Sequence, residues 1–276
     1  MKNVRVAICE WSLPIKGPSM FPLAKELGLD GIQIDDWSSW EHSFPLSDKK
    51  IRKSYLDAAR ETGMAIPSMG CNGFSRLGGF VNRLGTHEGE MSVYAILRSK
   101  DICEEMGIPL VMFPCCWSGF IHTEDDYENM ARMLSKVLPY FENSPVDIAI
   151  ESVLTPQKYK EPFEYVGSKK LKIYYDTQNT QYFASAYPPE EIRELDISDI
   201  PEIHFKEGKL KSQGCLHYGD GETGFDEMVS VLREKGYQGW CVIENFYTKP
   251  SWLVKDEDVW TSIKEDVGRL KEAFRE

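Results

Sequence analysis

Short apolar runs alternate along this chain with longer stretches in which apolar and polar positions recur with helical spacing. The short runs have the length of buried strands, and the longer stretches have the pattern of helices with one apolar face. This alternation is typical of repeated strand–helix–strand units around a parallel sheet. Eight segments are predicted to be strands: 4–9, 31–35, 64–69, 109–113, 146–150, 171–175, 202–205 and 240–243.

Residues that start and end helices stand at the borders of the amphipathic stretches. Ser47 and Asp48 can cap a helix that continues through Thr62 and ends at Gly63. Further helices are predicted at 86–106 before Gly107, from Thr123 onward with an acidic first turn, at 225–235 before Gly236, and at 256–274. No helix bounds are assigned in the short segment after the fifth strand or around Pro188 and Pro189.

The chain length fits one large domain. A (β/α)₈ TIM barrel typically needs about 250 residues, and this chain has 276, without a low-complexity linker. We therefore expect an α/β fold, a (β/α)₈ barrel, in a single domain covering residues 1–276. The alternative is an open α/β sheet, but no GxGxxG or GxxxxGK[ST] motif follows the first strand.

The charge balance argues against some classes of partner. The chain has 44 acidic and 32 basic residues, for a net charge of −12, which disfavours nucleic acid and membrane surfaces. No apolar stretch approaches the ~18 residues of a membrane span, and the first one is too short for a signal peptide. Seven scattered cysteines without a CxxC motif suit reduced thiols in a cytoplasmic protein. The sequence leaves open whether the chain forms a homo-oligomer.

Four residues that can bind metal lie on or just after the last four predicted strands. Glu151, Asp176, His204 and Glu244 recur at about one per strand–helix repeat, and the C-terminal strand ends carry the active sites of this fold. Alternation of side chains along the strands predicts that Glu151, His204 and Glu244 point toward the barrel axis. Any one acidic residue there has a plain alternative as a turn residue or helix cap.

Converging carboxylates repel each other unless a cation lies among them. Oxygen ligands with one imidazole suit Mn²⁺, Mg²⁺, Co²⁺ or Zn²⁺, and the sequence does not choose among these ions. The four residues together therefore predict a site for one divalent metal ion.

Several longer motifs resemble a known family. They are Asp30-Gly31-Ile32-Gln33-Ile34, the Asp176-x-x-Asn179 pair, Ile203-His204-Phe205-Lys206-Glu207, Gly219-Asp220-Gly221-Glu222, and Gly236-Tyr237-Gln238-Gly239-Trp240 before Glu244. With Glu151 after the fifth strand, they make the chain similar to the xylose-isomerase-like barrels grouped as sugar-phosphate isomerases and epimerases. Ketose 3-epimerases, L-ribulose-5-phosphate 3-epimerases and inosose dehydratases belong to that group.

The resemblance implies specific roles. It implies that Glu151, Asp176, His204 and Glu244 hold the metal, and that Glu151 and Glu244 are the acid–base pair. Three positions depart from the ketose 3-epimerases: Gln33 replaces a glutamate, Asn179 a histidine and Leu210 an arginine. Those positions contact substrate in that subgroup, so the departures argue against 3-epimerisation of a free ketose.

Other residues have weaker signals. Lys206 faces inward, where it can bind a carbonyl or a phosphate, or simply pair with a carboxylate. Asn179 is a second candidate for binding substrate. Four aromatic residues after early strands can form an apolar wall for a sugar ring, although core packing explains them as well; these are Trp11, Trp37, Phe113 and Trp117.

The predicted function is a metal-dependent isomerase or epimerase of a sugar or sugar phosphate. Metal polarisation of a carbonyl makes the neighbouring C–H acidic and stabilises an enediolate, and the two glutamates remove and return the proton. Three alternatives stay open: a lyase of the inosose-dehydratase type on the same site, a non-catalytic partner subunit that retains the fold, and a phosphodiesterase of the endonuclease IV type. The last requires more histidines than the five present.

Overall fold

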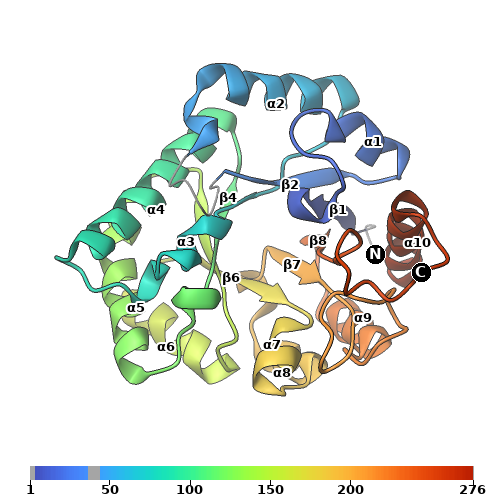
Figure 1. Ribbon diagram of the computed structural model, residues 1–276. Coiled ribbons are helices and arrows are strands. Elements are labelled where there is room, and N and C mark those ends of the chain that lie inside the picture. The colour runs from blue at the N-terminus through green and yellow to red at the C-terminus, as the bar shows by residue number, and fades with distance from the viewer. Residues whose placement is uncertain (1–3, 37–43, 276) are drawn as a thin grey trace. The chain divides into compact units, whose positions relative to one another are not determined.

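A computed structural model describes residues 4–36 and 44–275 of the chain. Its eight strands form a closed parallel sheet in chain order from β1 to β8, with helices between successive strands (Figure 1). This confirms the predicted (β/α)₈ barrel. The strands are β1 (Arg5–Cys9), β2 (Gly31–Asp35), β3 (Met69–Gly70), β4 (Leu110–Pro114), β5 (Asp147–Glu151), β6 (Leu171–Asp176), β7 (Glu202–Phe205) and β8 (Trp240–Ile243).

The third strand is shorter than predicted and begins later. The prediction placed it at 64–69, whereas β3 contains Met69 and Gly70 alone. Ala65 makes an isolated bridge to Gly31, and no strand continues through Pro67. Proline has no N–H to donate to a neighbouring strand, which interrupts the pairing at this point.

Three predicted helices are confirmed with their caps. α2 (Lys49–Thr62) and α4 (His87–Met106) have the predicted ends, and Gly107 closes α4 in the left-handed conformation. α5 (Glu124–Val137) begins with a capping box, in which Thr123 and Asp126 each accept a hydrogen bond from the other's backbone N–H.

The remaining helices differ more from the sequence prediction. α9 (Phe225–Glu234) lies where predicted, and α10 (Val259–Ala273) starts three residues later than expected because Asp258 caps it. Five helices were not assigned from the sequence: α1 (Met20–Glu26), α3 (Asn72–Arg76), α6 (Pro156–Val166), α7 (Asn179–Ala184) and α8 (Pro188–Glu194). Proline at the first position of α8 needs no N–H partner there, so Pro188 and Pro189 begin a helix rather than prevent one. Short 3₁₀ turns complete the described chain at η1 (Glu10–Ser12), η2 (Pro45–Ser47), η3 (Gly79–Val81), η4 (Trp117–Gly119), η5 (Leu138–Tyr140) and η6 (Ile197–Asp199).

The chain forms two compact units. The first unit contains residues 1–33, 57–67 and 174–276, and the second contains 34–56 and 68–173. In the first unit Ala7, Cys9, Trp240 and Val242 form a buried cluster between β1 and β8. Val242 and Glu244 share a strand face by alternation, so Glu244 continues the side of β8 that carries this cluster.

Two further expectations concern thiols and membranes. All seven cysteines are free thiols, as their scattered positions predicted. Across residues 4–36 and 44–275, no helix has both the length and the apolar character needed to cross a membrane.

Candidate active site

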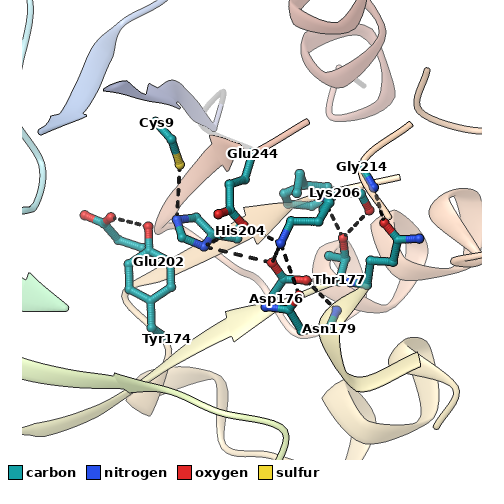
Figure 2. Close-up of polar contacts among 12 residues, drawn as sticks. Cys9, Tyr174, Asp176, Thr177, Asn179, Glu202, His204, Lys206, Gly214 and Glu244 are labelled. Carbon is teal, nitrogen blue, oxygen red and sulfur yellow. Dashed lines mark hydrogen bonds and ion pairs between the residues drawn. The ribbon is translucent and has the colours of Figure 1, made fainter. Parts of the chain in front are cut away.

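Strand register in the first unit brings several predicted site residues together. Asp176 at the end of β6 is paired with His204 on β7, and His204 is paired with Val242 on β8. Side chains at paired positions of parallel neighbours point the same way. The ends of β6, β7 and β8 therefore present Asp176, His204 and Glu244 on one side of the sheet, as Figure 2 shows.

Lys206 joins these residues through two ion pairs. Its Nζ lies 2.9 Å from Oδ2 of Asp176 and 2.5 Å from Oε2 of Glu244. The Nδ1 atom of His204 lies 3.4 Å from the same Glu244 oxygen and 4.0 Å from Oδ2 of Asp176. Lys206 is 3% exposed, so solvent screens this cluster little. The carboxylate pairing expected as the plain alternative for Lys206 is therefore present, in the middle of the candidate site.

The two oxygens of Asp176 have different partners. Oδ1 accepts hydrogen bonds from the backbone N–H groups of Gln178 at 2.7 Å and Asn179 at 2.6 Å, at the start of α7. These are donors that a helix start leaves without a partner inside the helix. Oδ2 instead faces Lys206 and His204. Asp176 thus caps a helix with one oxygen and contributes to the charged cluster with the other.

Glu244 is held at both oxygens. The indole Nε1 of Trp11 donates to its Oε1 at 2.8 Å, while Oε2 faces Lys206 and His204. Burial by itself would raise the pKa of Glu244, but the charge of Lys206, the charge of His204 when that ring is protonated, and the hydrogen bonds from Lys206 and Trp11 lower it well below its usual value. Glu244 is therefore ionised at neutral pH.

Gln33 on β2, which stands where the ketose 3-epimerases have a glutamate, contacts the Nε2 side of the His204 ring. Its Oε1 is 2.7 Å from His204 Nε2, and its Nε2 donates to the Tyr174 hydroxyl at 3.0 Å. The Cys9 thiol, which is paired with Gln33 in the sheet register, lies 3.3 Å from His204 Nε2 and donates to Gln33 Oε1 at 3.2 Å. The sequence did not predict these contacts, since they join residues on separate strands.

Asn179 contacts the ammonium group of Lys206. Its Oδ1 accepts from Lys206 Nζ at 3.1 Å, and Gln213 Nε2 also donates to it. The ring of Phe246 lies 5.3 Å from the same ammonium. Both residues predicted to bind substrate, Lys206 and Asn179, are therefore in direct contact, and Gln213 is a neighbour that the sequence did not single out.

Glu151 belongs to the second unit. It ends β5, and its side chain is buried, at 7% exposed. Its backbone carbonyl accepts a hydrogen bond from Cys115 at 2.7 Å, which continues the pairing of β4 with β5. Glu151 thus has the strand-end position that the sequence predicted.

The aromatic residues predicted as an apolar wall serve different purposes. Trp11 contacts Glu244 and packs edge-on against His204 at 5.9 Å. Phe113 is fully buried among other phenylalanines, so core packing explains it. Trp117 is 49% exposed and carries the Arg76 guanidinium 3.9 Å from its ring centroid. Trp37 lies outside the described residues.

The first-unit side chains fit a divalent cation. One ligand atom from each of Asp176, His204 and Glu244 lies within 4.8 Å of the others, and all three residues are buried. Two carboxylates with one imidazole are donors that Mn²⁺, Mg²⁺, Co²⁺ and Zn²⁺ accept. In the structure the Lys206 ammonium lies between the two carboxylates and supplies the positive charge that such close lone pairs need. Cys9, His204 and Glu244 make a second group of ligand atoms within the same distance.

Glu207 organises the loop that carries the Gly219–Glu222 motif. Its carboxylate accepts from the backbone N–H groups of Gly208, Gly219 and Thr223 and from the Thr223 hydroxyl, at 2.9 to 3.3 Å. A side chain at Gly221 would begin 2.3 Å from this carboxylate, so the loop requires glycine there. Burial raises the pKa of Glu207 and outweighs these hydrogen bonds, which lower it. The last residue of the Ile203–Glu207 motif is therefore structural.

A second buried network lies between the loop after β7 and α10. Asp266 accepts hydrogen bonds from the Tyr247 hydroxyl at 2.6 Å and the Asn245 amide at 2.8 Å, and pairs with His217 Nδ1 at 2.7 Å. His217 Nε2 lies 3.2 Å from Glu257. Burial alone would lower the pKa of His217, but the hydrogen bonds and charges of Asp266 and Glu257 raise it. This network fixes the loop that follows Glu244.

Comparison with known proteins decides the family. The profile described as "Xylose isomerase-like TIM barrel" matches residues 21–273. The chain belongs to this family. It is 27% identical over 231 residues to 2-epi-5-epi-valiolone 7-phosphate 2-epimerase from Actinoplanes sp., a match that covers 83% of this chain and 82% of that protein.

Solved structures show the same fold. The apo form of 3-keto-D-glucoside 4-epimerase from E. coli has a TM-score of 0.76 at 14% identity and covers 98% of this chain and 100% of its own. The IOLI protein with a bound zinc atom has a TM-score of 0.76 at 17% identity and covers 99% of each chain. The family resemblance and fold predicted from the sequence are therefore confirmed.

Proposed function

We propose that this member of the family is a divalent-metal-dependent isomerase or epimerase of a sugar or sugar phosphate, acting as one domain over residues 1–276. Glu151, Asp176, His204 and Glu244 are its proposed metal ligands, and Glu151 and Glu244 its acid–base pair. Lys206 and Asn179 are proposed to bind substrate. The observation that carries the proposal is the buried cluster in which His204 Nδ1 and two carboxylates face one another around a lysine ammonium.

Two other findings support a metal site. Asp176, His204 and Glu244 of the first unit form a candidate set for holding one cation, and the structural neighbour IOLI contains a zinc atom. When bound, a divalent cation supplies Lewis acidity toward a carbonyl oxygen and an adjacent hydroxyl, which makes the neighbouring C–H acidic. The donor set accepts several ions, so Mn²⁺, Mg²⁺, Co²⁺ and Zn²⁺ are all included in the proposal.

The protein's own residues account for the proton transfers. Glu244 is ionised because the charge and hydrogen bond of Lys206 lower its pKa, so it is suited to accept a proton from the substrate carbon. The Trp11 hydrogen bond fixes one of its oxygens and leaves Oε2 directed at the charged cluster. In the proposed epimerisation Glu151 starts protonated and gives that proton to the resulting enediolate from the opposite face. Glu244 then loses the proton that it accepted and Glu151 regains one, both by exchange with solvent.

Lys206 and Asn179 suit an oxygen-rich substrate. The ammonium of Lys206 can donate a hydrogen bond to a hydroxyl or phosphate oxygen of the substrate. The Asn179 side chain can exchange its contacts with Lys206 and Gln213 for contacts with a substrate hydroxyl. The similar Actinoplanes protein is named as a 2-epimerase of 2-epi-5-epi-valiolone 7-phosphate. A phosphorylated keto-sugar or keto-cyclitol is therefore the first substrate class to test.

Reaction in D₂O with a panel of keto-sugar and keto-cyclitol phosphates tests the proposed function. An isomerase or epimerase that forms an enediolate places solvent deuterium at the abstracted carbon without loss of mass as water. A dehydratase gives a product lighter by one water, which would replace the proposed reaction with elimination at the same site. Neither deuterium incorporation nor dehydration across the panel, with Mn²⁺ present, would favour a partner subunit without activity.

A further inference from the structure

A series of buried, hydrogen-bonded polar side chains connects Glu202, the first residue of β7, to the candidate metal ligand His204. The Tyr174 hydroxyl donates to Oε2 of Glu202 at 2.9 Å, and Gln33 Nε2 donates to the same hydroxyl at 3.0 Å. Gln33 Oε1 then lies 2.7 Å from His204 Nε2. Gln33, Tyr174 and His204 are fully buried, and Glu202 is 2% exposed. Figure 2 shows the Tyr174–Glu202 contact beside His204.

The direction of these hydrogen bonds follows from their first member. The Tyr174 hydroxyl donates its proton to Oε2 of Glu202, which accepts it. The Tyr174 oxygen is then an acceptor, and the Gln33 NH₂ group must face it. Gln33 therefore presents its carbonyl oxygen to His204, where an acceptor requires a proton on Nε2. Neutral imidazole carries one proton, so its lone pair is on Nδ1.

We propose that Glu202, Tyr174 and Gln33 are positioning residues that set the tautomer of His204. They keep the proton on Nε2 and direct the Nδ1 lone pair toward Asp176 and Glu244, at 4.0 and 3.4 Å. The role of that lone pair as a metal ligand rests on the proposed function. Hydrogen bonding at the second ring nitrogen is a general way in which proteins orient histidine ligands.

The Tyr174 hydroxyl determines which end of the Gln33 amide faces His204, because a glutamine amide can be placed in either of two orientations. A carboxylate at position 33 would accept from His204 in either orientation, whereas the amide of Gln33 can offer an oxygen or an NH₂ group. Without the Tyr174 hydroxyl, a flipped amide would donate to Nε2 and place the proton on Nδ1. The N–H would then point at the proposed ligand site, where it cannot bind a cation.

Nitrogen-15 NMR of the histidine rings tests the tautomer in the metal-free protein, at a pH where the spectrum itself shows the His204 ring to be neutral. We expect wild-type His204 to carry its proton on Nε2. Tyr174→Phe, which removes one hydroxyl, should give a mixture or the Nδ1–H form. Glu202→Gln keeps an acceptor for Tyr174 and should retain more of the wild-type tautomer. Tyr237→Phe is the matched control, because the Tyr237 hydroxyl is also buried but donates to the backbone of Trp240.

Mn²⁺ titration of the same variants is the second measurement. Mutation of a residue that hydrogen-bonds to a metal ligand typically lowers metal affinity 10- to 100-fold. Tyr174→Phe and Gln33→Leu should therefore bind Mn²⁺ about that much more weakly than wild type and Tyr237→Phe. The expected tautomers without Mn²⁺ binding in any variant would support the positioning role and contradict the proposed function. A wild-type proton on Nδ1, or Tyr174→Phe with wild-type tautomer and affinity, would overturn the inference.

Discussion

The indole of Trp11 donates a hydrogen bond of 2.8 Å to Glu244, so the residue just after β1 fixes the carboxylate just after β8. A hydrogen bond to a charged group contributes about 1.5–3 kcal/mol, which corresponds to about 10- to 100-fold in rate if it is needed in the transition state. We expect Trp11→Phe to lower kcat by about that factor. The measurement is steady-state kinetics on the substrate found in the panel. Trp252→Phe, another buried indole that packs on His217 and Tyr247 instead, should keep near-wild-type kcat.

Metal content is expected to follow the candidate ligands. The purified protein should hold about one divalent ion per chain, and His204→Ala and Asp176→Ala should each release it. Elemental analysis provides the count, with exposed His122→Ala as the control. At 100 times its Kd, added Mn²⁺ should stabilise wild type by about 2.7 kcal/mol. Wild-type protein with neither bound metal nor thermal stabilisation by Mn²⁺ would contradict the metal assignment.

The two glutamates should be separable by isotope exchange. Glu151→Gln and Glu244→Gln each replace a base with an amide, and acid–base groups contribute about 10²- to 10⁴-fold to rate. Both variants should therefore lose turnover to that extent. A variant that still exchanges deuterium without completing inversion identifies the face served by the remaining glutamate. Full activity of either variant would rule out the two-glutamate mechanism.

Lys206 should matter for substrate rather than for metal content. Its ammonium pairs with Asp176 and Glu244, and Lys206→Met removes this charge while retaining most of the side-chain volume. We expect kcat/KM to fall about 10- to 100-fold, the size of a charged hydrogen bond, with metal content unchanged. Lys249→Met is the control, because that ammonium contacts the same Phe246 ring from an exposed residue. Wild-type kinetics in Lys206→Met would leave Lys206 with a structural role only.

Stability should depend on pH through His217. Its pKa is raised in the folded protein by Asp266 and Glu257, so its stabilising contribution is complete below the unfolded pKa of about 6.5 and declines as pH rises through the folded value. The difference in unfolding free energy between wild type and His217→Gln should therefore shrink from mildly acidic to alkaline pH. Urea unfolding across that range measures it, beside His87→Gln at the exposed start of α4. A difference that grows with pH would refute this linkage.

The sequence was most informative where one residue type has one strong local preference. The runs around Ile148, Ile203 and Val242 defined strands because apolar residues there fill a buried sheet, and strand alternation then placed His204 and Glu244 on one side. The third strand was misplaced because Pro67 breaks a pattern that otherwise reads as extended. Helices α1, α3 and α7 are five to seven residues long, which is too short for a clear helical period.

The contacts around His204 could not be predicted from the chain alone. Cys9 and Gln33 reach its ring from β1 and β2, and Trp11 reaches Glu244 from the turn after β1. Such contacts depend on register between strands and on rotamers, which a pattern of residue types does not specify. From the sequence, Gln33 differs only as an amide where the ketose 3-epimerases have a glutamate, and the structure shows that this amide contacts His204 and Tyr174.

The segment from His204 to Glu207 contains residues with different roles, and a mutational survey of activity would not distinguish these roles. Glu207 touches neither Asp176 nor Glu244 through any contact described above; it anchors the backbone of Gly208, Gly219 and Thr223. Loss of that anchor would loosen the loop that follows Lys206, and activity would fall as if a catalytic group had been removed. A screen that ranks positions by lost turnover alone would therefore place Glu207 among the reacting residues, and an independent measure of folding is needed to separate it from Glu244.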